Sequence, residues 1–403
     1  MFRVPKKSDG KKMEIKIKMA AWCAAAGRPY NEDNFLLKDN LSVPEWGIIE
    51  TDKVISLDEK GALLVVCDGM GGANAGEVAS ELAVKTIQEW FAPEKLTQKT
   101  LASPKSIMRH IEDAINAADE IIKEDGDRNE EHEGMGSTIV LAWAIGESVY
   151  VGWCGDSRAY RFNPAFGLEP LTRDHSYVQG LVDKGELSAE LAFDHPDSNI
   201  ITRSLGYKGQ KARPDTGCFP LYDNDVIMLC SDGLSGVLRD EEIQEIIAQN
   251  GDSMENCRAA LWSESENAGW TDNITIALCQ IVSGAGKAPE NLIKKNDEAG
   301  NKKRKKSFKA AIVIAILLVI GLCIGGYVLL KEKFSGAAIE PGGGIQNTNE
   351  SEEIQKDEPP AIDPDPEQPP VSEPAARNEP PSSGPEEREE SPDENLTRIT
   401  NDD

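Results

Sequence analysis

The chain has 403 residues, of which 39% are hydrophobic, and a formal net charge of −27 at pH 7. One compact core of ordinary size does not need this length, so we expect segments of more than one kind. The strong negative charge makes the chain as a whole a poor nucleic-acid binder, because nucleic acids carry negative phosphates.

Short apolar runs bounded by glycine or polar residues predict buried strands. These runs are 13–23, 63–67, 138–145, 149–153, 159–162, 226–231 and 274–281. Apolar side chains recur at helical spacing between them, which predicts helices at 75–91, 107–123, 241–248 and 254–268. Because the strands follow one another in hairpin-like pairs, we expect an α+β fold in which helices cover antiparallel sheets.

Eight cysteines are scattered along the chain without a Cys-x-x-Cys pair, and only four histidines are present. This supports neither a disulfide scaffold nor a zinc site. Most of the cysteines lie inside apolar runs, where cysteine behaves as a small hydrophobic residue. We therefore expect a reduced, cytosolic domain.

Three aspartates stand at the borders of apolar runs. Asp68 follows the run 62–67, Asp232 follows the run that ends at 231, and Asp272 directly precedes 273–278. A carboxylate at the rim of a buried sheet is costly unless a positive group meets it. Carboxylate oxygens are the ligands that hard divalent cations prefer. The sequence therefore predicts a metal-dependent catalyst in which the three carboxylates converge.

Three neighbouring motifs add to this hypothesis, and each also has a purely structural explanation. The glycines after Asp68 let a ligand approach the backbone, but they are also typical of an ordinary turn. Arg28 is a planar cation suited to phosphate, although a surface salt bridge explains a single arginine as well. Asp156 lies in a Gly-Asp-Ser-Arg turn between two strands, where a hairpin turn with an aspartate bound to its own backbone is the alternative.

Short motifs follow one another along residues 20–282. They are Arg-x-x-Asn-Glu-Asp at Arg28, Val-x-Asp-Gly-Met-Gly-Gly at Val66, Gly-Glu-x-Ala-Ser at Gly76, Gly-Ser-Thr at Gly136, Gly-Asp-Ser-Arg at Gly155, Leu-Thr-Arg-Asp-His-Ser at Leu171, Ile-Thr-Arg-Ser-Leu-Gly at Ile201, Ser-Asp-Gly-Leu at Ser231 and Asp-Asn-Ile-Thr at Asp272. In kind, order and spacing they resemble the bacterial metal-dependent, phosphatase 2C-like (PPM-type) serine/threonine protein phosphatases. The resemblance implies a four-layer αββα sandwich of two antiparallel sheets flanked by helices.

The resemblance also implies Mn²⁺ or Mg²⁺ as the cofactor, with two ions and a place for a third. Asp68 would bridge two ions, and the Gly69 carbonyl would bind one of them. Asp232 and Asp272 would bind the other ion. The implied reaction is hydrolysis of phosphoserine and phosphothreonine by a metal-activated water, in which Asp68, Asp232, Asp272 and Arg28 form the catalytic set.

Four further roles follow from the same resemblance. Glu32 and Asp33 would hold waters on the ions, and Asp156 would bind the third ion together with Asp232. Arg28 would hold the substrate phosphate. The expected partners are phosphorylated proteins, among them a Ser/Thr protein kinase and its substrates, and no nucleic acid.

The sequence also departs from the family pattern. Met70 and Ala73 stand where many members have a histidine, so no protein general acid is assigned. The segment 175–199 resembles the mobile flap of the family, and there Ser198 replaces a common arginine. For His175 and His195, a structural hydrogen-bonding role is favoured over catalysis.

Residues 310–330 form an uncharged and almost wholly apolar stretch. At about 1.5 Å per residue they span roughly 30 Å, the thickness of the hydrocarbon core of a bilayer. We predict a transmembrane helix here, with a buried core helix as the alternative. The basic run at 302–306 precedes it, which predicts a single-pass protein of the cell membrane with a cytoplasmic catalytic domain and an extracytoplasmic tail.

The sequence thus divides into five segments. They are an N-terminal segment (1–19), the PPM-type phosphatase domain (20–282), a basic linker (283–309), the transmembrane helix (310–330) and an acidic tail (331–403). The tail is rich in proline and glutamate and has no aromatic residue after Phe334, a composition that predicts disorder. The basic run alone could also indicate a nuclear signal or a nucleic-acid patch.

Two alternative functions remain open at this point. A catalytically inactive scaffold with the PPM fold would be expected to lack one or more of the metal-binding aspartates, and none is missing. A sensor that signals through its extracytoplasmic tail would need residues 340–403 for its function in cells, but not for phosphatase activity.

Overall fold

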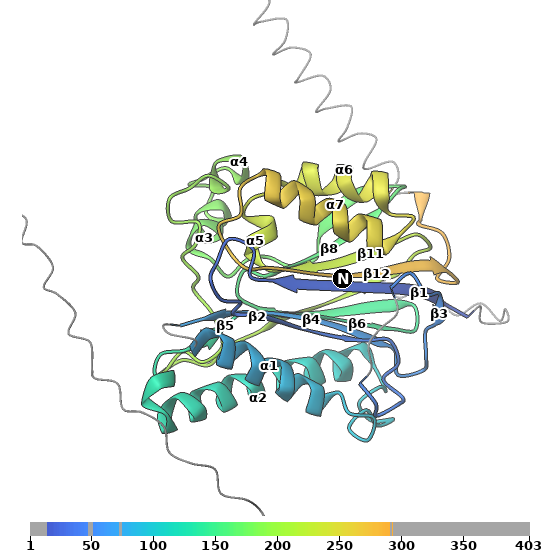
Figure 1. The fold of residues 1–403 in the computed structure, drawn as a ribbon. Helices are drawn as coiled ribbons and strands as arrows, with labels where there is room; N and C mark the ends of the chain where they lie inside the picture. Colours follow the sequence, from blue (N-terminus) through green and yellow to red (C-terminus); the bar gives the residue numbers. More distant parts are fainter. Residues whose placement is uncertain (1–13, 47–50, 72–74, 291, 293–403) are drawn as a thin grey trace, which may run out of the picture. The chain divides into compact units, whose positions relative to one another are not determined.

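Two antiparallel sheets pack face to face in the structure, a computed structural model that describes residues 14–46, 51–71, 75–290 and 292. The sheets form the two middle layers in Figure 1, and helices cover their outer faces. The predicted α+β class is confirmed. The predicted transmembrane helix at 310–330 and the tail lie outside the described residues. Among the helices that are described, none has both the length and the apolar composition needed to cross a membrane.

Each sheet has six strands. The spatial order of the first is β3 (Ile55–Ser56), β1 (Lys16–Ala24), β12 (Ile274–Ser283), β11 (Val226–Cys230), β8 (Arg158–Asn163) and β9 (Gly167–Pro170). The order of the second is β10 (Asp215–Pro220), β7 (Ser148–Cys154), β6 (Ile139–Ile145), β4 (Ala62–Met70) and β2 (Asp33–Lys38), and β5 (Gly136–Ser137) pairs with the end of β4.

Strand β4 shows why an unbroken apolar run becomes a strand in this fold. Successive side chains of a strand point to opposite faces of its sheet. Leu64 and Val66 enter the core between the two sheets. Leu63, Val65 and Cys67 enter a second core beneath the helices. Because both faces of β4 are buried, the run contains no polar residue before Asp68.

The helices fall into two groups. α1 (Ala75–Trp90) and α2 (Pro104–Arg128) cover the second sheet, while α5 (Asp232–Ser235), α6 (Asp240–Asn250) and α7 (Met254–Asn267) cover the first (Figure 1). A 3-10 turn, η1 (Glu130–His132), follows α2, and the short helices α3 (Tyr177–Asp183) and α4 (Ala189–Ala192) lie between β9 and β10. A capping box of Ser103 and Ser106, followed by a proline, defines the start of α2.

Every predicted strand and helix within residues 13–281 is present, with bounds that differ by a few residues. The strands β2, β3, β5, β9 and β10, the helices α3, α4 and α5 and the 3-10 turn η1 had no counterpart in the prediction. The hairpin alternative for the turn at Asp156 is wrong, because β7 and β8 belong to different sheets. That turn carries the chain from one sheet to the other.

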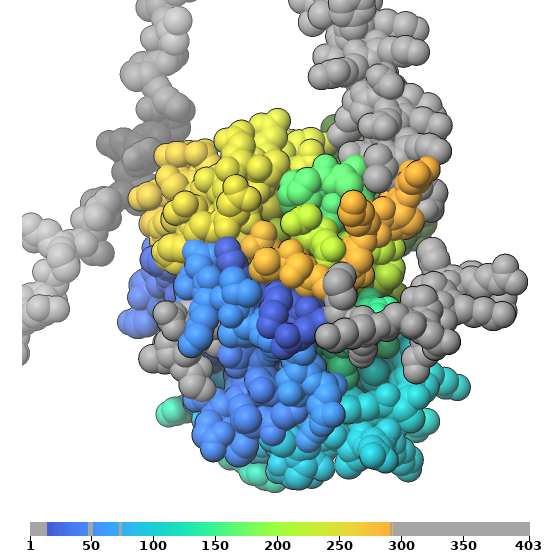
Figure 2. Space-filling model, turned by 90° about the vertical axis from the view of Figure 1, so that its right-hand side faces the viewer, coloured from blue at the N-terminus to red at the C-terminus, as the bar shows by residue number. Residues whose placement is uncertain are grey.

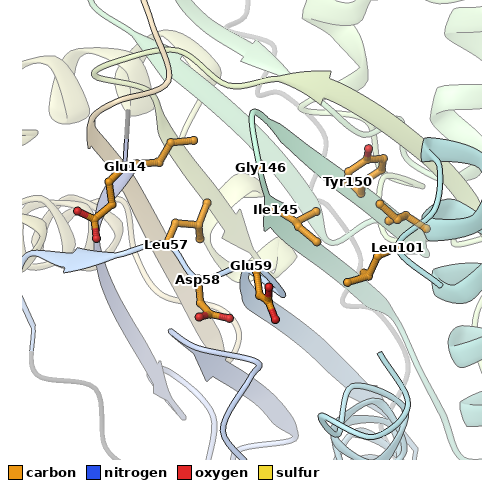
Figure 3. Close-up of a pocket in the computed structure, with 10 residues that line it drawn as sticks. Glu14, Leu57, Asp58, Glu59, Leu101, Ile145, Gly146 and Tyr150 are labelled. Carbon is orange, nitrogen blue, oxygen red and sulfur yellow. The ribbon is translucent and has the colours of Figure 1, made fainter. Parts of the chain in front are cut away.

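The two ends of the sandwich differ. At one end, which we call the carboxylate end, β1, β4, β7 and β11 finish and β2, β6, β8 and β12 begin. Figure 2 looks onto the opposite end, where the start of β1 and the residues after β12 lie side by side. A pocket of about 500 Å³ opens there, lined by the carboxylates of Glu14, Asp58 and Glu59 and by apolar residues such as Leu57 and Ile145 (Figure 3). None of the motif residues that carry the expected chemistry lines it.

Candidate active site

Strand termini bring the predicted site residues together at the carboxylate end. Asp68 lies near the end of β4, and Asp33 opens β2 directly opposite it in the antiparallel register. Asp232 follows β11 and Asp272 precedes β12, the strand that pairs with β11. Asp156 follows β7. Residues that are far apart in the sequence therefore face one another because strand ends from both sheets meet here.

Asp33 links the two sheets through a buried carboxylate that is only 5% exposed. The hydroxyl groups of Ser231 and Thr275, both on the first-sheet side, donate to its Oδ2 at 2.7 Å each. Its Oδ1 is buried and has no hydrogen-bond partner. Burial raises the pKa of Asp33 from 3.8 to about 7, and the two hydroxyl bonds only partly offset this effect.

Asp68 and Asp232 bring their carboxyl groups into contact. The two side chains lie within hydrogen-bonding reach of each other, an arrangement that requires one of the two carboxyl groups to carry a proton. Burial, followed by the charge of Asp33, raises the pKa of Asp68 well above its usual range. Burial and then Asp272 raise the pKa of Asp232, whose Oδ1 is buried without a partner. Carboxylates packed in this way repel one another unless protons or cations separate them.

Backbone bonds hold Asp68 in place. Its N–H donates to Thr138 Oγ1 at 3.1 Å, and its carbonyl accepts from the N–H of Thr138 at 2.8 Å. The Thr138 hydroxyl lies 2.7 Å from the Ser157 hydroxyl, at the turn between the sheets. Thr138 thus ties Asp68 to the turn that carries Asp156. Burial and then Asp232 raise the pKa of Asp156 to about 8.

Arg28 contacts the site from the loop after β1. Its Nη2 donates to Asp272 Oδ2 at 2.7 Å, and its Nε donates to the Thr271 carbonyl at 2.9 Å. The Arg28 side chain is 52% exposed, so it faces solvent at the mouth of the site. In this structure its guanidinium group therefore uses two of its five N–H donors, one of them on a proposed metal ligand. The two on Nη1 and the second one on Nη2 are not used by these bonds.

Glu32 and Gly69 are fixed by close backbone approach. The Gly69 N–H donates to the Glu32 carbonyl at 3.2 Å. A Cβ atom on Gly69 would lie 2.1 Å from the Gly76 carbonyl, and one on Gly76 would lie 2.7 Å from Glu32 Oε1. Any larger residue at these two positions would therefore push the start of α1 away from the site.

The residues of the carboxylate end fit a divalent metal. Among the described residues, no three His, Cys, Asp or Glu side chains are drawn together into a closed metal cage. However, Asp33 and Asp232 each present a buried oxygen without a partner. Desolvation and mutual repulsion raise the pKa values of Asp33, Asp68, Asp156 and Asp232. Cations would relieve both costs, and an all-oxygen donor set suits Mg²⁺ or Mn²⁺.

The raised pKa of Asp33 predicts how metal-free stability depends on pH. The folded chain holds this proton up to pH about 7, whereas the unfolded chain loses it near 3.8. Asp33 therefore lowers the free energy of unfolding as the pH rises through this window. Asp33→Asn keeps an oxygen for both hydroxyl groups and removes the charge. We measure the thermal unfolding midpoints of the variant and the wild type in chelator. The midpoint of the variant minus that of the wild type should become larger as the pH rises from about 5 to about 8. A difference that shrinks or stays constant over this range would contradict the assignment.

The structure also adds residues that the sequence analysis passed over. The amide of Asn273 accepts from the Glu32 N–H at 2.8 Å and donates to the carbonyls of Ala25 and Tyr30 at 3.1 and 2.8 Å. Asn273 thus fixes the loop that carries Arg28. Ser231, Thr275, Thr138 and Ser157 were likewise not predicted as site residues, although each lies next to a motif carboxylate or within a motif. Their proximity to the aspartates in the sequence was the available signal.

Comparisons with known proteins agree with this architecture. The family model described as Protein phosphatase 2C matches residues 47–269. The chain is 32% identical to the serine/threonine phosphatase stp of Listeria innocua over 253 residues, which cover 63% of this chain and 91% of that protein. It is also 32% identical to protein phosphatase PhpP of Streptococcus pneumoniae over 219 residues, which cover 54% of this chain and 85% of PhpP.

Solved structures show the same similarity. The serine/threonine phosphatase Stp1 from Staphylococcus aureus superposes with a TM-score of 0.57 at 28% identity, covering 68% of this chain and 99% of Stp1. The catalytic domain of the serine/threonine protein phosphatase PstP, in complex with two manganese ions, gives a TM-score of 0.52 at 25% identity and covers 67% of this chain and all of that domain (100%).

The fold, the site and these similarities together define a protein serine/threonine phosphatase. The chain belongs to the protein phosphatase 2C family, in its bacterial branch. The family resemblance expected from the motifs is thereby confirmed.

Proposed function

We propose that the chain is a membrane-anchored protein phosphatase that hydrolyses phosphoserine and phosphothreonine with two Mn²⁺ or Mg²⁺ ions and a place for a third. The observation that carries the metal dependence is the set of buried carboxylates at the carboxylate end, which lacks sufficient positive charge of its own. The manganese ions bound to the similar PstP domain support the choice of metal.

Five residues would hold the ions directly, and two more would hold water molecules around them. Asp68 would lie between two ions, the Gly69 carbonyl would bind one of them, and Asp232 and Asp272 would bind the other. Glu32 and Asp33 would hold water molecules around them, and Asp156 would join Asp232 at the third ion. When bound, the ions supply a water that is deprotonated near neutral pH and a clamp for the phosphoryl oxygens.

The other steps belong to side chains of this chain. Arg28 would bind the substrate phosphate with its exposed guanidinium and stabilise negative charge on the non-bridging oxygens. Its contact with Asp272 places that cation within reach of the metal ligands, so one side chain aligns the substrate with the ions. Met70 offers no proton, so we assign protonation of the leaving oxygen to water.

Removal and restoration of metal test this proposal. Full-length protein stripped with a chelator should release no phosphate from a phosphothreonine peptide, and added Mn²⁺ or Mg²⁺ should restore the activity. A peptide that carries phosphotyrosine should be hydrolysed far more slowly and serves as the substrate control. An unchanged rate in chelator would contradict the metal-dependent mechanism.

The anchoring and the partner are proposals of the same kind. The apolar residues 310–330 support a membrane span, and the basic run before it supports a cytoplasmic phosphatase domain. Deletion of 310–330 should move the protein from the membrane fraction to the soluble fraction. A Ser/Thr protein kinase and its substrates should gain phosphate in cells that lack the protein. Recovery of the full-length chain in the soluble fraction would contradict the anchor.

A further inference from the structure

His175 lies at the base of the segment that connects β9 to β10. It is 6% exposed, and its ring stacks on Trp153 of β7 with centroids 6.1 Å apart and an interplanar angle of 16°. The segment that begins here, 176–201, carries α3 and α4 and returns to the sandwich at Thr202. His175 therefore lies between the core of the domain and the segment 176–201, which leaves the sandwich and returns to it.

The ring of His175 has a defined tautomer. The Gly155 N–H donates to Nδ1 at 3.1 Å, so Nδ1 is the acceptor and Nε2 carries the proton. Nε2 lies 3.0 Å from Asp215 Oδ2 on β10, to which it donates. Arg203 also faces this group, because its Nη1 lies 3.2 Å from Nε2, 3.4 Å from Asp215 Oδ2 and 3.2 Å from the Arg213 carbonyl. The network fixes both edges of the ring.

The backbone of His175 makes further links to the same neighbours. Its N–H donates to the Gly155 carbonyl at 2.9 Å, so Gly155 is held by two bonds from one residue. Its carbonyl accepts from the N–H of Thr202 at 2.6 Å and from the Thr202 hydroxyl at 3.0 Å. Ser176 and Ile201 form a bridge directly beyond this point. Both ends of the segment 176–201 and the turn at Gly155 are thus joined at His175.

The turn at Gly155 depends on such support. Gly155 has a φ of +121°, a conformation that residues with side chains rarely adopt. A Cβ atom there would lie 2.6 Å from Thr138 Cβ, so position 155 has no room for a side chain that could stabilise the turn by its own contacts. The next residue is Asp156, whose carboxylate faces Asp232. A shift of Gly155 would move the Asp156 carboxylate with it.

We propose that His175 is a positioning residue that holds the Gly155 turn, and hence the carboxylate of Asp156, against the site while closing the base of the 176–201 segment. The side chain acts through Gly155 and does not touch the reacting groups. The inference rests on the proposed function in one respect, the metal-binding role of Asp156; the support that His175 gives to the Gly155 turn does not depend on it.

Two substitutions separate the two edges of the ring. His175→Asn places an amide oxygen near the position of Nδ1, where it accepts the Gly155 N–H. His175→Gln places an amide nitrogen near Nε2, where it reaches Asp215, and removes the acceptor for Gly155. Both variants lose the imidazole and its stacking on Trp153, so a purely structural role predicts equal effects.

Amide hydrogen exchange of the full-length protein in chelator gives a readout that does not depend on activity. We expect His175→Gln to raise exchange in the segment 155–158, while His175→Asn leaves it near the wild-type level. Asp215→Asn, which keeps an acceptor for Nε2, should behave like the wild type. Asp215→Ala should raise exchange in the same segment and serves as a second probe should the glutamine variant fail to fold. Equal exchange in the two His175 variants, or no rise in Asp215→Ala, would overturn the proposal.

Metal titration then tests the link to Asp156. The half-saturating Mn²⁺ concentration for peptide hydrolysis should rise by about 10- to 100-fold in His175→Gln and by less than about threefold in His175→Asn. A lower thermal stability with unchanged Mn²⁺ dependence in both variants would contradict a positioning role. Failure of the proposed function would show differently, as a wild-type protein that neither binds Mn²⁺ nor needs it.

Discussion

Replacing Asp232 by Asn is expected to abolish phosphate release and, at the same time, to stabilise the metal-free protein. The Asp232 carboxylate contacts Asp68, and the negative charge of Asp272 raises its pKa. One of its oxygens is buried without a hydrogen-bond partner. Without its charge the site loses a metal ligand, and we expect the rate to fall by at least about a thousandfold. Without metal, the same change removes a buried repulsion, so the unfolding midpoint should rise by about 2–4 °C for each kcal/mol gained.

The opposite signs make this prediction specific. Measurements would combine phosphate release with Mn²⁺ and thermal unfolding in chelator. Asp113→Asn is the matched control, because Asp113 is an exposed aspartate on α2 whose ion pair with Arg109 is long, at 3.8 Å. It should change neither quantity. A variant of Asp232 that loses activity because it is less stable without metal would show that the carboxylate supports the fold and does not serve a metal.

Arg28 provides the second large expected effect. Arg28→Ala should lower kcat/KM for a phosphothreonine peptide by about 100- to 1,000-fold, the range seen when one charged or hydrogen-bonding partner of a transition state is removed. Arg28→Lys keeps the charge but loses the fork that spans Asp272 and the Thr271 carbonyl, so it should recover only part of the loss.

The Mn²⁺ affinity distinguishes a substrate role from a structural role of Arg28. Because Arg28 is the cation that pairs with Asp272 in the metal-free chain, its removal frees this carboxylate for a metal. Calorimetric titration should therefore show an unchanged or higher Mn²⁺ affinity in Arg28→Ala. An affinity that falls in parallel with kcat/KM would mean that Arg28 orders the metal ligands instead of binding the phosphate.

The sequence predicted the elements whose pattern is dictated by burial on two faces. β11 and the first six residues of β4 are uninterrupted apolar runs, and β12 is a largely apolar one, because helices cover one face and the other sheet covers the second. β10 was missed because it is an edge strand with a glycine, a proline and exposed polar residues. β2 was missed because it begins with the polar residues Asp33 and Asn34, the first of which belongs to the site, so that only a short apolar run remains.

The contacts within the site lay beyond what the sequence pattern could predict. The motifs indicated which carboxylates converge, but not which neutral groups hold them. The Asp33 carboxylate binds hydroxyl groups that are 198 and 242 positions away in the chain, and Arg28 meets Asp272 over 244 positions. Such pairs follow from the register of β2 on β4 and of β1 on β12, which is a property of the assembled sheets.

Strand β12 separates the site from the place where the described chain leaves the sandwich. Its ten residues lead from Ile274, two positions after Asp272 at the carboxylate end, to Ser283 at the opposite end, a distance of about 30 Å at the usual rise of a strand. Ser283 pairs with Lys16, so the chain leaves the domain far from the catalytic groups. Whatever follows the described residues is therefore joined to the domain at the end opposite the carboxylate end.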